Sequence, residues 1–353
     1  MELGYLGYDR WFEAQSRELQ EDDRALARVT AVDRGAVLVR NEQGEIPAEC
    51  SGKFRFAVAV PADLPCVGDW VTVQYHNDGA AGIIHGVVPR KTWLRRKCAG
   101  KDVAYQMIAA NIDVAFIMQS CHYDFNVRRL ERYLVVAHEG GIEPVIVLTK
   151  TDLITAGELE QIRAAMVQAG ITATTIALSN TTGAGLADVE QRLVAGKTYC
   201  LLGSSGVGKT TLINRLLGRE ALATKTVSGT GEGSHTTTRR QLIMLAQGAM
   251  LIDTPGMREL GIMGAGDGID SSFTEISDLS VNCRYADCTH TQDPGCAVLA
   301  AIADGVLSEE RYQSYCKLRK ESAYHEMSYA EKRKKDKDFG RFVKSALKQL
   351  KHR

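Results

Sequence analysis

Residues 203–210 read GSSGVGKT and match the phosphate-loop pattern G-x-x-x-x-G-K-[ST]. An apolar run at 197–202 predicts a strand before this loop, and an amphipathic run at 211–217 predicts a helix after it. In such a turn, backbone N–H groups converge on phosphate oxygens, and glycines let the main chain approach them closely. A chance Gly/Ser turn would lack these flanking elements. We expect phosphate contacts from Gly203, Ser204, Ser205, Gly206, Val207, Gly208, Lys209, Thr210 and Thr211.

A second motif, D-T-P-G at 253–256, follows a predicted hairpin made of residues 241–245 and 249–252. We expect Lys209 to bridge the β- and γ-phosphates, Thr210 and Asp253 to bind Mg²⁺, and the Gly256 amide to sense the γ-phosphate. Residues 229–238 (GTGEGSHTTT) lie between the two motifs and are too polar for a core, which predicts a mobile loop. A hydroxyl of Thr237 or Thr238 could reach Mg²⁺ from there; the alternative is an ordinary surface loop.

A base-reading motif precedes the phosphate loop in the chain. A buried-strand pattern at 144–148 leads into Thr149, Lys150, Thr151 and Asp152, and a second apolar run at 171–178 ends at Ser179. The Asp152 carboxylate can accept hydrogen bonds from guanine N1–H and its exocyclic amine, a donor pair that adenine does not offer. T-K-x-D is a weak signal alone, but it shares this chain with a phosphate loop, and together they predict GTP rather than ATP.

The order of these motifs is rotated, because in an ordinary small GTPase the phosphate loop comes first. Rotation is compatible with an unchanged arrangement of strands, since chain termini of compact domains lie at the surface. We therefore predict a circularly permuted P-loop GTPase domain at residues 98–265, a mostly parallel sheet with helices on both faces. The chain leaves this domain shortly after the Asp253 motif.

Four metal-ligating residues follow: Cys283, Cys288, His290 and Cys296, spaced C-x4-C-x-H-x5-C. Three thiolates and one imidazole match a closed tetrahedral zinc site, which stabilises a small domain with little core. The other six cysteines are scattered singly, which disfavours both a disulfide framework and a chance cluster. We predict an α-helical zinc-binding domain at residues 266–353, with helices at 297–304 and 309–320. Residues 331–353 carry ten Lys/Arg against three acidic residues, which indicates contacts with phosphate backbones or a solvated charged face.

The sequence pattern of the N-terminal part predicts a small β-barrel at residues 25–97. Five short strand-like runs occupy residues 27–32, 36–39, 54–60, 70–75 and 82–88. The oligonucleotide-binding (OB) fold is the commonest five-stranded barrel, and an SH3-like barrel is the alternative. We expect a basic linker at 89–97 and a flexible arm at 1–24. The 353 residues carry no net formal charge and no apolar run of transmembrane length, so we expect a cytoplasmic multidomain α/β protein.

With the barrel, the rotated nucleotide motifs and the C-x4-C-x-H-x5-C module in this order, the chain from about residue 25 onward resembles the RsgA (YjeQ) family of circularly permuted GTPases. The resemblance implies GTP hydrolysis stimulated by the small ribosomal subunit, late in its maturation, with barrel and zinc domains binding ribosomal RNA. It also implies that residues 125–134 begin the first helix of the GTPase domain. We expect a monomer that binds GTP or GDP, with Mg²⁺ and one structural Zn²⁺, and that binds no membrane.

Two positions depart from related enzymes. The family's base reader usually opens with Asn, whose amide braces the phosphate loop, whereas Thr149 offers only a hydroxyl. Met257 stands where Ras-like enzymes have the glutamine that orients water, and the resemblance makes His235 the candidate for that role. Two alternatives remain: a nucleotide-gated RNA-binding checkpoint protein whose hydrolysis is incidental, and an ATP-driven zinc nucleic-acid enzyme.

Overall fold

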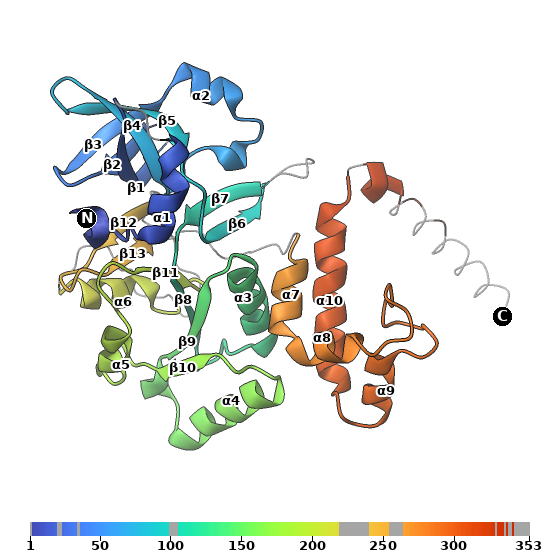
Figure 1. The fold of residues 1–353 in the computed structure, drawn as a ribbon. Coiled ribbons are helices and arrows are strands. Elements are labelled where there is room, and N and C mark those ends of the chain that lie inside the picture. The colour runs from blue at the N-terminus through green and yellow to red at the C-terminus, as the bar shows by residue number, and fades with distance from the viewer. Residues whose placement is uncertain are drawn as a thin grey trace.

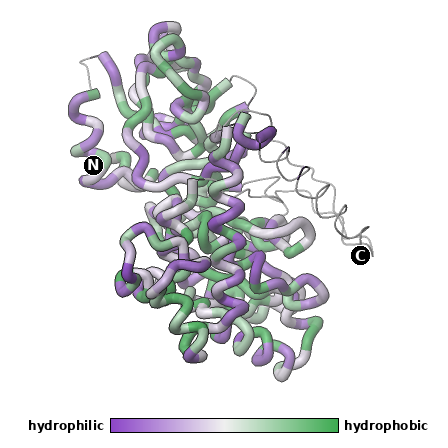
Figure 2. The backbone as a smooth tube through the Cα atoms, turned by 90° about the vertical axis from the view of Figure 1, so that its right-hand side faces the viewer, coloured by the Kyte–Doolittle hydropathy of each residue, from purple (hydrophilic) through white to green (hydrophobic). Residues whose placement is uncertain are grey.

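The computed structural model describes residues 2–19, 23–33, 36–98, 105–218, 240–253, 264–328, 330–334, 337 and 341. These form a barrel with an N-terminal helical segment, a central α/β domain and a C-terminal group of helices (Figure 1). The predictions for His235, Thr237, Thr238 and Gly256, and for most of the basic tail, lie outside the described residues. Figure 2 shows hydrophobic and hydrophilic stretches interspersed along the backbone, and none of the described helices is long and apolar enough to cross a membrane.

The central domain is built on five parallel strands and one antiparallel strand. Their order is β10 (Thr174–Ala177), β9 (Glu143–Thr149), β8 (Val114–Ser120), β11 (Thr198–Leu202), β13 (Met250–Asp253) and β12 (Arg240–Met244), with β12 antiparallel to β13. This confirms the predicted parallel sheet and the hairpin before Asp253. The inner strands β8, β9, β11 and β13 are buried on both faces along most of their length, which explains why the sequence shows continuous apolar runs there rather than alternation.

Helices cover both faces of this sheet. Along β9, Ile146 and Leu148 face the core that holds Leu130 of α3 and Met166 of α4, while Val145 and Val147 face the core that holds residues of α5 and α6. The bounds are α3 (Val127–Glu139), α4 (Ala156–Gln168), α5 (Leu186–Gln191) and α6 (Lys209–Leu216), with a 3-10 turn η4 (Thr151–Leu153) after β9. The predicted start of the first domain helix is confirmed by α3.

The barrel has five strands, as predicted. They are β1 (Ala25–Asp33), β2 (Ala36–Arg40), β3 (Glu45–Cys50), β4 (Trp70–His76) and β5 (Ala81–Val87). The order β1-β2-β3-β5-β4 closes because β1 also pairs with β4. The inner side of the barrel is filled by small branched side chains, among them Val29, Val39, Val71, Val73 and Ile84.

One barrel prediction is wrong. The run at 54–60 is not a strand: residues Gly52–Ala57 form helix α2, followed by a 3-10 turn η3 (Pro61–Asp63), and the third strand is Glu45–Cys50. Ser51 caps α2 by accepting a hydrogen bond from the Phe54 amide. Alternating phenylalanines suggested a strand, yet Phe56 points into solvent and only Phe54 packs on the barrel. The true strand carries Pro47 and two glutamates, which are poor strand formers.

The barrel and the central sheet are joined directly. Strand β1 pairs with β12 at Ala31–Gln241 and Val32–Arg240, so the eleven strands form one continuous sheet. The fully buried Arg28 of β1 donates to the Asn111 carbonyl at 3.0 Å and to Thr198 Oγ1 at 2.8 Å, both in the central domain. The barrel is therefore fastened to the nucleotide domain by backbone pairing and by a buried guanidinium.

The predicted linker at 89–97 and the predicted flexible arm are both wrong for the described residues. Strand β6 (Trp93–Lys97) pairs with β7 (Tyr105–Ala110), and Arg90 forms an ion pair with Asp69 at 2.8 Å. Residues 2–19 form η1 (Glu2–Leu6), α1 (Arg10–Ser16) and η2 (Arg17–Leu19). Leu6 and Phe12 are buried against Trp70 of the barrel, so this apolar contact holds the N-terminal segment in place.

The C-terminal helices pack on α3. They are α7 (Gly266–Ser272), α8 (Thr274–Ser280), α9 (Ala297–Ala303) and α10 (Glu309–Glu326), and α9 and α10 confirm the two predicted helices. Figure 1 shows α7 and α10 beside α3. Val135 of α3 belongs to their apolar core, and the Gly268 amide donates to Glu139 at 3.0 Å. A Cβ at Gly268 would lie 2.4 Å from the Val135 carbonyl oxygen, so this close approach requires glycine.

Candidate nucleotide site and metal centre

The predicted nucleotide-site segments meet at one edge of the central sheet. The base-reading motif follows β9, Ser179 follows β10, the phosphate loop follows β11, and Asp253 ends β13. These four strands are parallel, so their carboxyl ends share an edge, which is where α/β sheets bind ligands. Chain order and spatial order therefore differ as predicted, and the rotated motifs converge.

The phosphate loop has a backbone that only glycine adopts readily. Gly203, Gly206 and Gly208 have φ of 146°, 76° and 102°. A Cβ at Gly203 would lie 2.3 Å from the Met118 carbonyl oxygen, which no side chain could tolerate. Helix α6 begins at Lys209, so its free amides point at the loop. The loop can therefore present consecutive N–H groups to an anion.

Lys209 folds back over the phosphate loop. Its Nζ donates to the Gly203 and Ser204 carbonyls, both at 2.7 Å. Burial raises the pKa of Asp253, and the nearby charge of Lys209 acts against that rise. A desolvated carboxylate at the end of β13 is a group that a bound cation would stabilise, so the residues present fit Mg²⁺. Thr210, half-buried in the first turn of α6, supplies a hydroxyl on the same edge.

The base-reading motif is held in position by its neighbours. Ser179 Oγ donates to Asp152 Oδ1 at 2.7 Å, and this hydrogen bond lowers the pKa of Asp152 below its usual value. Asp152 is exposed and ionised, which is what acceptance from two guanine donors requires. Lys150 has a left-handed φ of 60°, and the Thr151 amide donates to the Leu178 carbonyl at 3.4 Å. These two hydrogen bonds hold the base-reading motif after β9 against the segment that follows β10.

Thr149 and Asn180 connect the base-reading side to the phosphate loop. Thr149 is fully buried, and its Oγ1 donates to the Val207 carbonyl at 2.8 Å. A threonine hydroxyl therefore does brace the loop. Asn180 Nδ2 donates to the Gly208 carbonyl at 3.1 Å. No sequence motif predicted a role for Asn180; its place directly after Ser179 is the signal that could have pointed to it.

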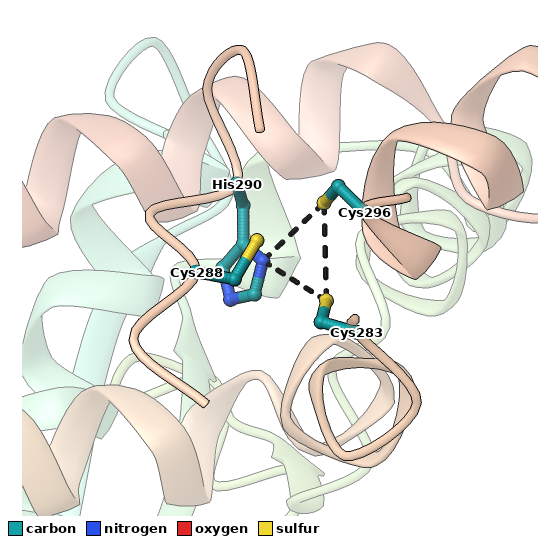
Figure 3. Close-up of side chains that lie close together, drawn as sticks. All are labelled: Cys283, Cys288, His290 and Cys296. Carbon is teal, nitrogen blue, oxygen red and sulfur yellow. Dashed lines mark hydrogen bonds between the residues drawn. The ribbon is translucent and has the colours of Figure 1, made fainter. Parts of the chain in front are cut away.

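The cysteine and histidine side chains form a compact cluster. Figure 3 shows Cys283, Cys288, His290 and Cys296 converging on one point. Cys283, Cys288 and His290 lie in the loop between α8 and α9, and Cys296 is the N-cap residue of α9. Their ligand atoms lie within 4.8 Å of one another. Nδ1 of His290 lies 3.6 Å from the Cys283 sulfur and 3.5 Å from the Cys296 sulfur, and these two sulfurs are 3.9 Å apart.

These distances fit a tetrahedral metal ion. With Zn–S bonds of about 2.3 Å and Zn–N bonds of about 2.0 Å, tetrahedral geometry separates two sulfurs by about 3.8 Å and sulfur from nitrogen by about 3.5 Å. The donor set also suits zinc, because thiolate and imidazole are the ligands it prefers. Tyr312 donates to the His290 carbonyl at 2.5 Å, which ties the loop to α10. With four protein ligands, no coordination position would remain for a reactant.

The comparisons with known proteins agree with this geometry. The model of the RsgA GTPase family matches residues 87–263. The chain is 42% identical to small ribosomal subunit biogenesis GTPase RsgA 2 of Lactiplantibacillus plantarum, over 100% of this chain and 99% of that relative. It is 41% identical to small ribosomal subunit biogenesis GTPase RsgA of Opitutus terrae, over 92% of this chain and 90% of that relative.

Two solved structures share the fold. The crystal structure of YjeQ from Thermotoga maritima superposes with a TM-score of 0.63 and 26% identity, covering 84% of this chain and 97% of that one. YloQ, described as a circularly permuted GTPase, gives a TM-score of 0.60 and 25% identity, covering 84% and 94%. Together with the rotated motifs on one sheet edge, these findings confirm the resemblance: the chain belongs to the RsgA family of circularly permuted GTPases.

Proposed function

We propose that this protein hydrolyses GTP during late maturation of the small ribosomal subunit and that the subunit stimulates the hydrolysis. The observation that carries the proposal is the convergence of the base reader and the phosphate loop on one edge, in a chain whose full-length relatives are described as small ribosomal subunit biogenesis GTPases. The proposed site of action is the cytoplasm, and the proposed form is a monomer.

The proposed mechanism assigns each step of recognition to a residue. Asp152 accepts from guanine, and the amides of residues 203–210 surround the phosphates. Lys209 leaves its two carbonyl acceptors for the β- and γ-phosphates, which are stronger acceptors because they are charged. Mg²⁺ on Thr210 and Asp253 would neutralise part of the phosphate charge.

The remaining catalytic assignments rest on residues outside the described part of the chain. His235 is proposed to position the attacking water, Thr237 or Thr238 to add a hydroxyl to Mg²⁺, and the Gly256 amide to contact the γ-phosphate. His235→Ala should lower subunit-stimulated turnover much more than GTP affinity. An unchanged stimulated rate would reject that assignment.

Helix α2 supports RNA binding by the barrel. Phe56 is 94% exposed, and Lys53 and Arg55 beside it are exposed as well. A single exposed aromatic is ordinary, but an exposed aromatic that shares one short helix with two exposed cations matches surfaces that stack unpaired bases and contact their phosphates. The basic composition of residues 331–353 adds a second segment suited to ribosomal RNA. We propose Zn²⁺ as a structural ion that orders the C-terminal region next to it.

GTP turnover with and without purified small ribosomal subunits tests the proposal, at several salt concentrations because phosphate contacts are salt-sensitive. We expect faster turnover with subunits. Phe56→Ala should weaken the stimulation and leave intrinsic turnover unchanged, while the control Val167→Ala, which trims an exposed valine on α4, should change neither. Absence of stimulation in the parent would contradict the proposal. Equal release from the subunit with GTP and with a nonhydrolysable analogue would favour the checkpoint alternative.

A further inference from the structure

Two neighbouring carbonyls of the phosphate loop are held by side chains from the base-reading edge. Thr149 Oγ1 donates to the Val207 carbonyl at 2.8 Å, and Asn180 Nδ2 donates to the Gly208 carbonyl at 3.1 Å. The Gly208 carbonyl also accepts the Leu212 amide of α6 at 2.9 Å, so both of its lone pairs are used. The loop is therefore fastened at two successive peptides from two different segments.

Fixing these carbonyls also fixes two amides. In a planar trans peptide the C=O and the following N–H point in opposite directions. Thr149 thus orients the Gly208 N–H, and Asn180 orients the Lys209 N–H. Both N–H groups belong to the loop that faces the phosphates, and Gly208, with φ of 102° and no side chain, has the most backbone freedom to lose.

The environment of Asn180 indicates that a contribution to folding stability is not the only role of this side chain. Its Oδ1 is buried and has no hydrogen-bond partner among the described residues. A buried acceptor without a partner is unfavourable for folding, and such groups in native structures usually have a functional reason. Exchanging the amide oxygen and nitrogen would set two oxygens against each other at Gly208, so that carbonyl fixes the orientation.

We propose that Asn180 is a positioning residue of the nucleotide site, which orients the Lys209 amide toward the phosphates and shares the bracing of the loop with Thr149. The inference rests on the proposed GTP site and deepens it. Because the β-phosphate is common to GTP and GDP, Asn180 acts on both nucleotides. It leaves the choice of base to Asp152.

Asn180→Leu is the decisive variant, because leucine has a similar size but neither the donor nor the unpaired acceptor. Stopped-flow measurement of fluorescent GTP and GDP should show both leaving about tenfold faster, the factor that one lost hydrogen bond represents. Melting of the nucleotide-free protein should stay unchanged or rise. A merely structural role would lower the melting temperature instead. Thr182→Val, whose hydroxyl in the same turn contacts only the Ala184 amide in the described structure, is the matched control and should release both nucleotides at the parent rate.

Two results would overturn the inference. One is nucleotide release from Asn180→Leu at a rate within about twofold of the parent rate. The other is that Thr182→Val releases both nucleotides as fast as Asn180→Leu does. Asn180→Asp, which places a carboxylate oxygen against the Gly208 carbonyl, should release both nucleotides faster still, and parent-like release would also count against the inference. A cycle with Thr149→Val should be non-additive, because both side chains brace adjacent peptides. Failure of the parent to bind GTP would instead reject the proposed function, so the two failures are distinguishable.

Discussion

Replacing Arg311 with methionine should loosen the contact between the C-terminal helices and α3. Arg311 Nη1 lies 2.9 Å from Glu131 Oε1, and the two side chains are 5% and 4% exposed. The guanidinium also donates to the Ser272 carbonyl at 2.6 Å and lies 3.7 Å above the Phe273 ring. Without it, the Glu131 carboxylate stays buried and uncompensated, which costs about 3–5 kcal/mol. Glu275, the other ionic partner, is 38% exposed and can be rehydrated.

Hydrogen exchange of the α7 and α10 amides measures this effect locally, which matters because a multidomain protein need not unfold in two states. Arg311→Met should lower the free energy of local opening by about 3–5 kcal/mol. Adding Glu131→Gln removes the stranded charge and should restore most of that loss. A change below about 1 kcal/mol in the single variant, or a double variant as unstable as the single one, would show that the Arg311–Glu131 ion pair does not hold these helices on α3.

Two further results are expected at the C-terminal region. Chelation of bound metal, or Cys283→Ser, should unfold the segment around the cluster while GTP affinity is kept, since all four ligands lie outside the nucleotide edge; elemental analysis showing no zinc would contradict the assignment. Burial lowers the pKa of His138, whose Nδ1 lies 2.8 Å from Ser272 Oγ. The unfolded state then binds the proton more readily, so stability is complete above about pH 6.5 and decreases as the pH falls toward the lowered folded pKa. Melting temperatures followed over this range should fall less steeply for His138→Gln, and an equal slope in both proteins would reject this account.

Sequence patterns predicted the central domain well because its chemistry and its burial both leave strong signals. Phosphate binding needs glycines and a lysine at fixed spacing, and strands covered on both faces need uninterrupted apolar runs such as 144–148 and 198–202. The metal cluster was predictable for the same reason, since thiolate and imidazole ligands are rare residue types at short spacing. The roles assigned to individual nucleotide contacts stay predictions.

The failures lie where tertiary contacts decide the local structure. Residues 54–60 alternate like a strand, but the Ser51 cap and the single inward side chain of Phe54 favour a helix. The N-terminal segment has no strong pattern of its own, yet Trp70 offers an apolar surface on which it folds. Arg28 and Asn180 donate hydrogen bonds to backbone carbonyls that are distant in sequence, and no motif spacing predicts such contacts.

We propose that the carboxylate of Asp152 selects guanine for a phosphate loop that follows it in the chain. Measured dissociation constants of GTP, ATP and xanthosine triphosphate for the parent and for Asp152→Asn test this most directly. Xanthine carries an oxygen in place of the guanine amine, so the side-chain amide that this substitution introduces could donate to it. We expect the parent to bind GTP with a much lower dissociation constant than ATP or xanthosine triphosphate. We expect the variant to bind xanthosine triphosphate most tightly. Equal affinity of the parent for GTP and ATP, or an unchanged preference in the variant, would contradict guanine selection by Asp152.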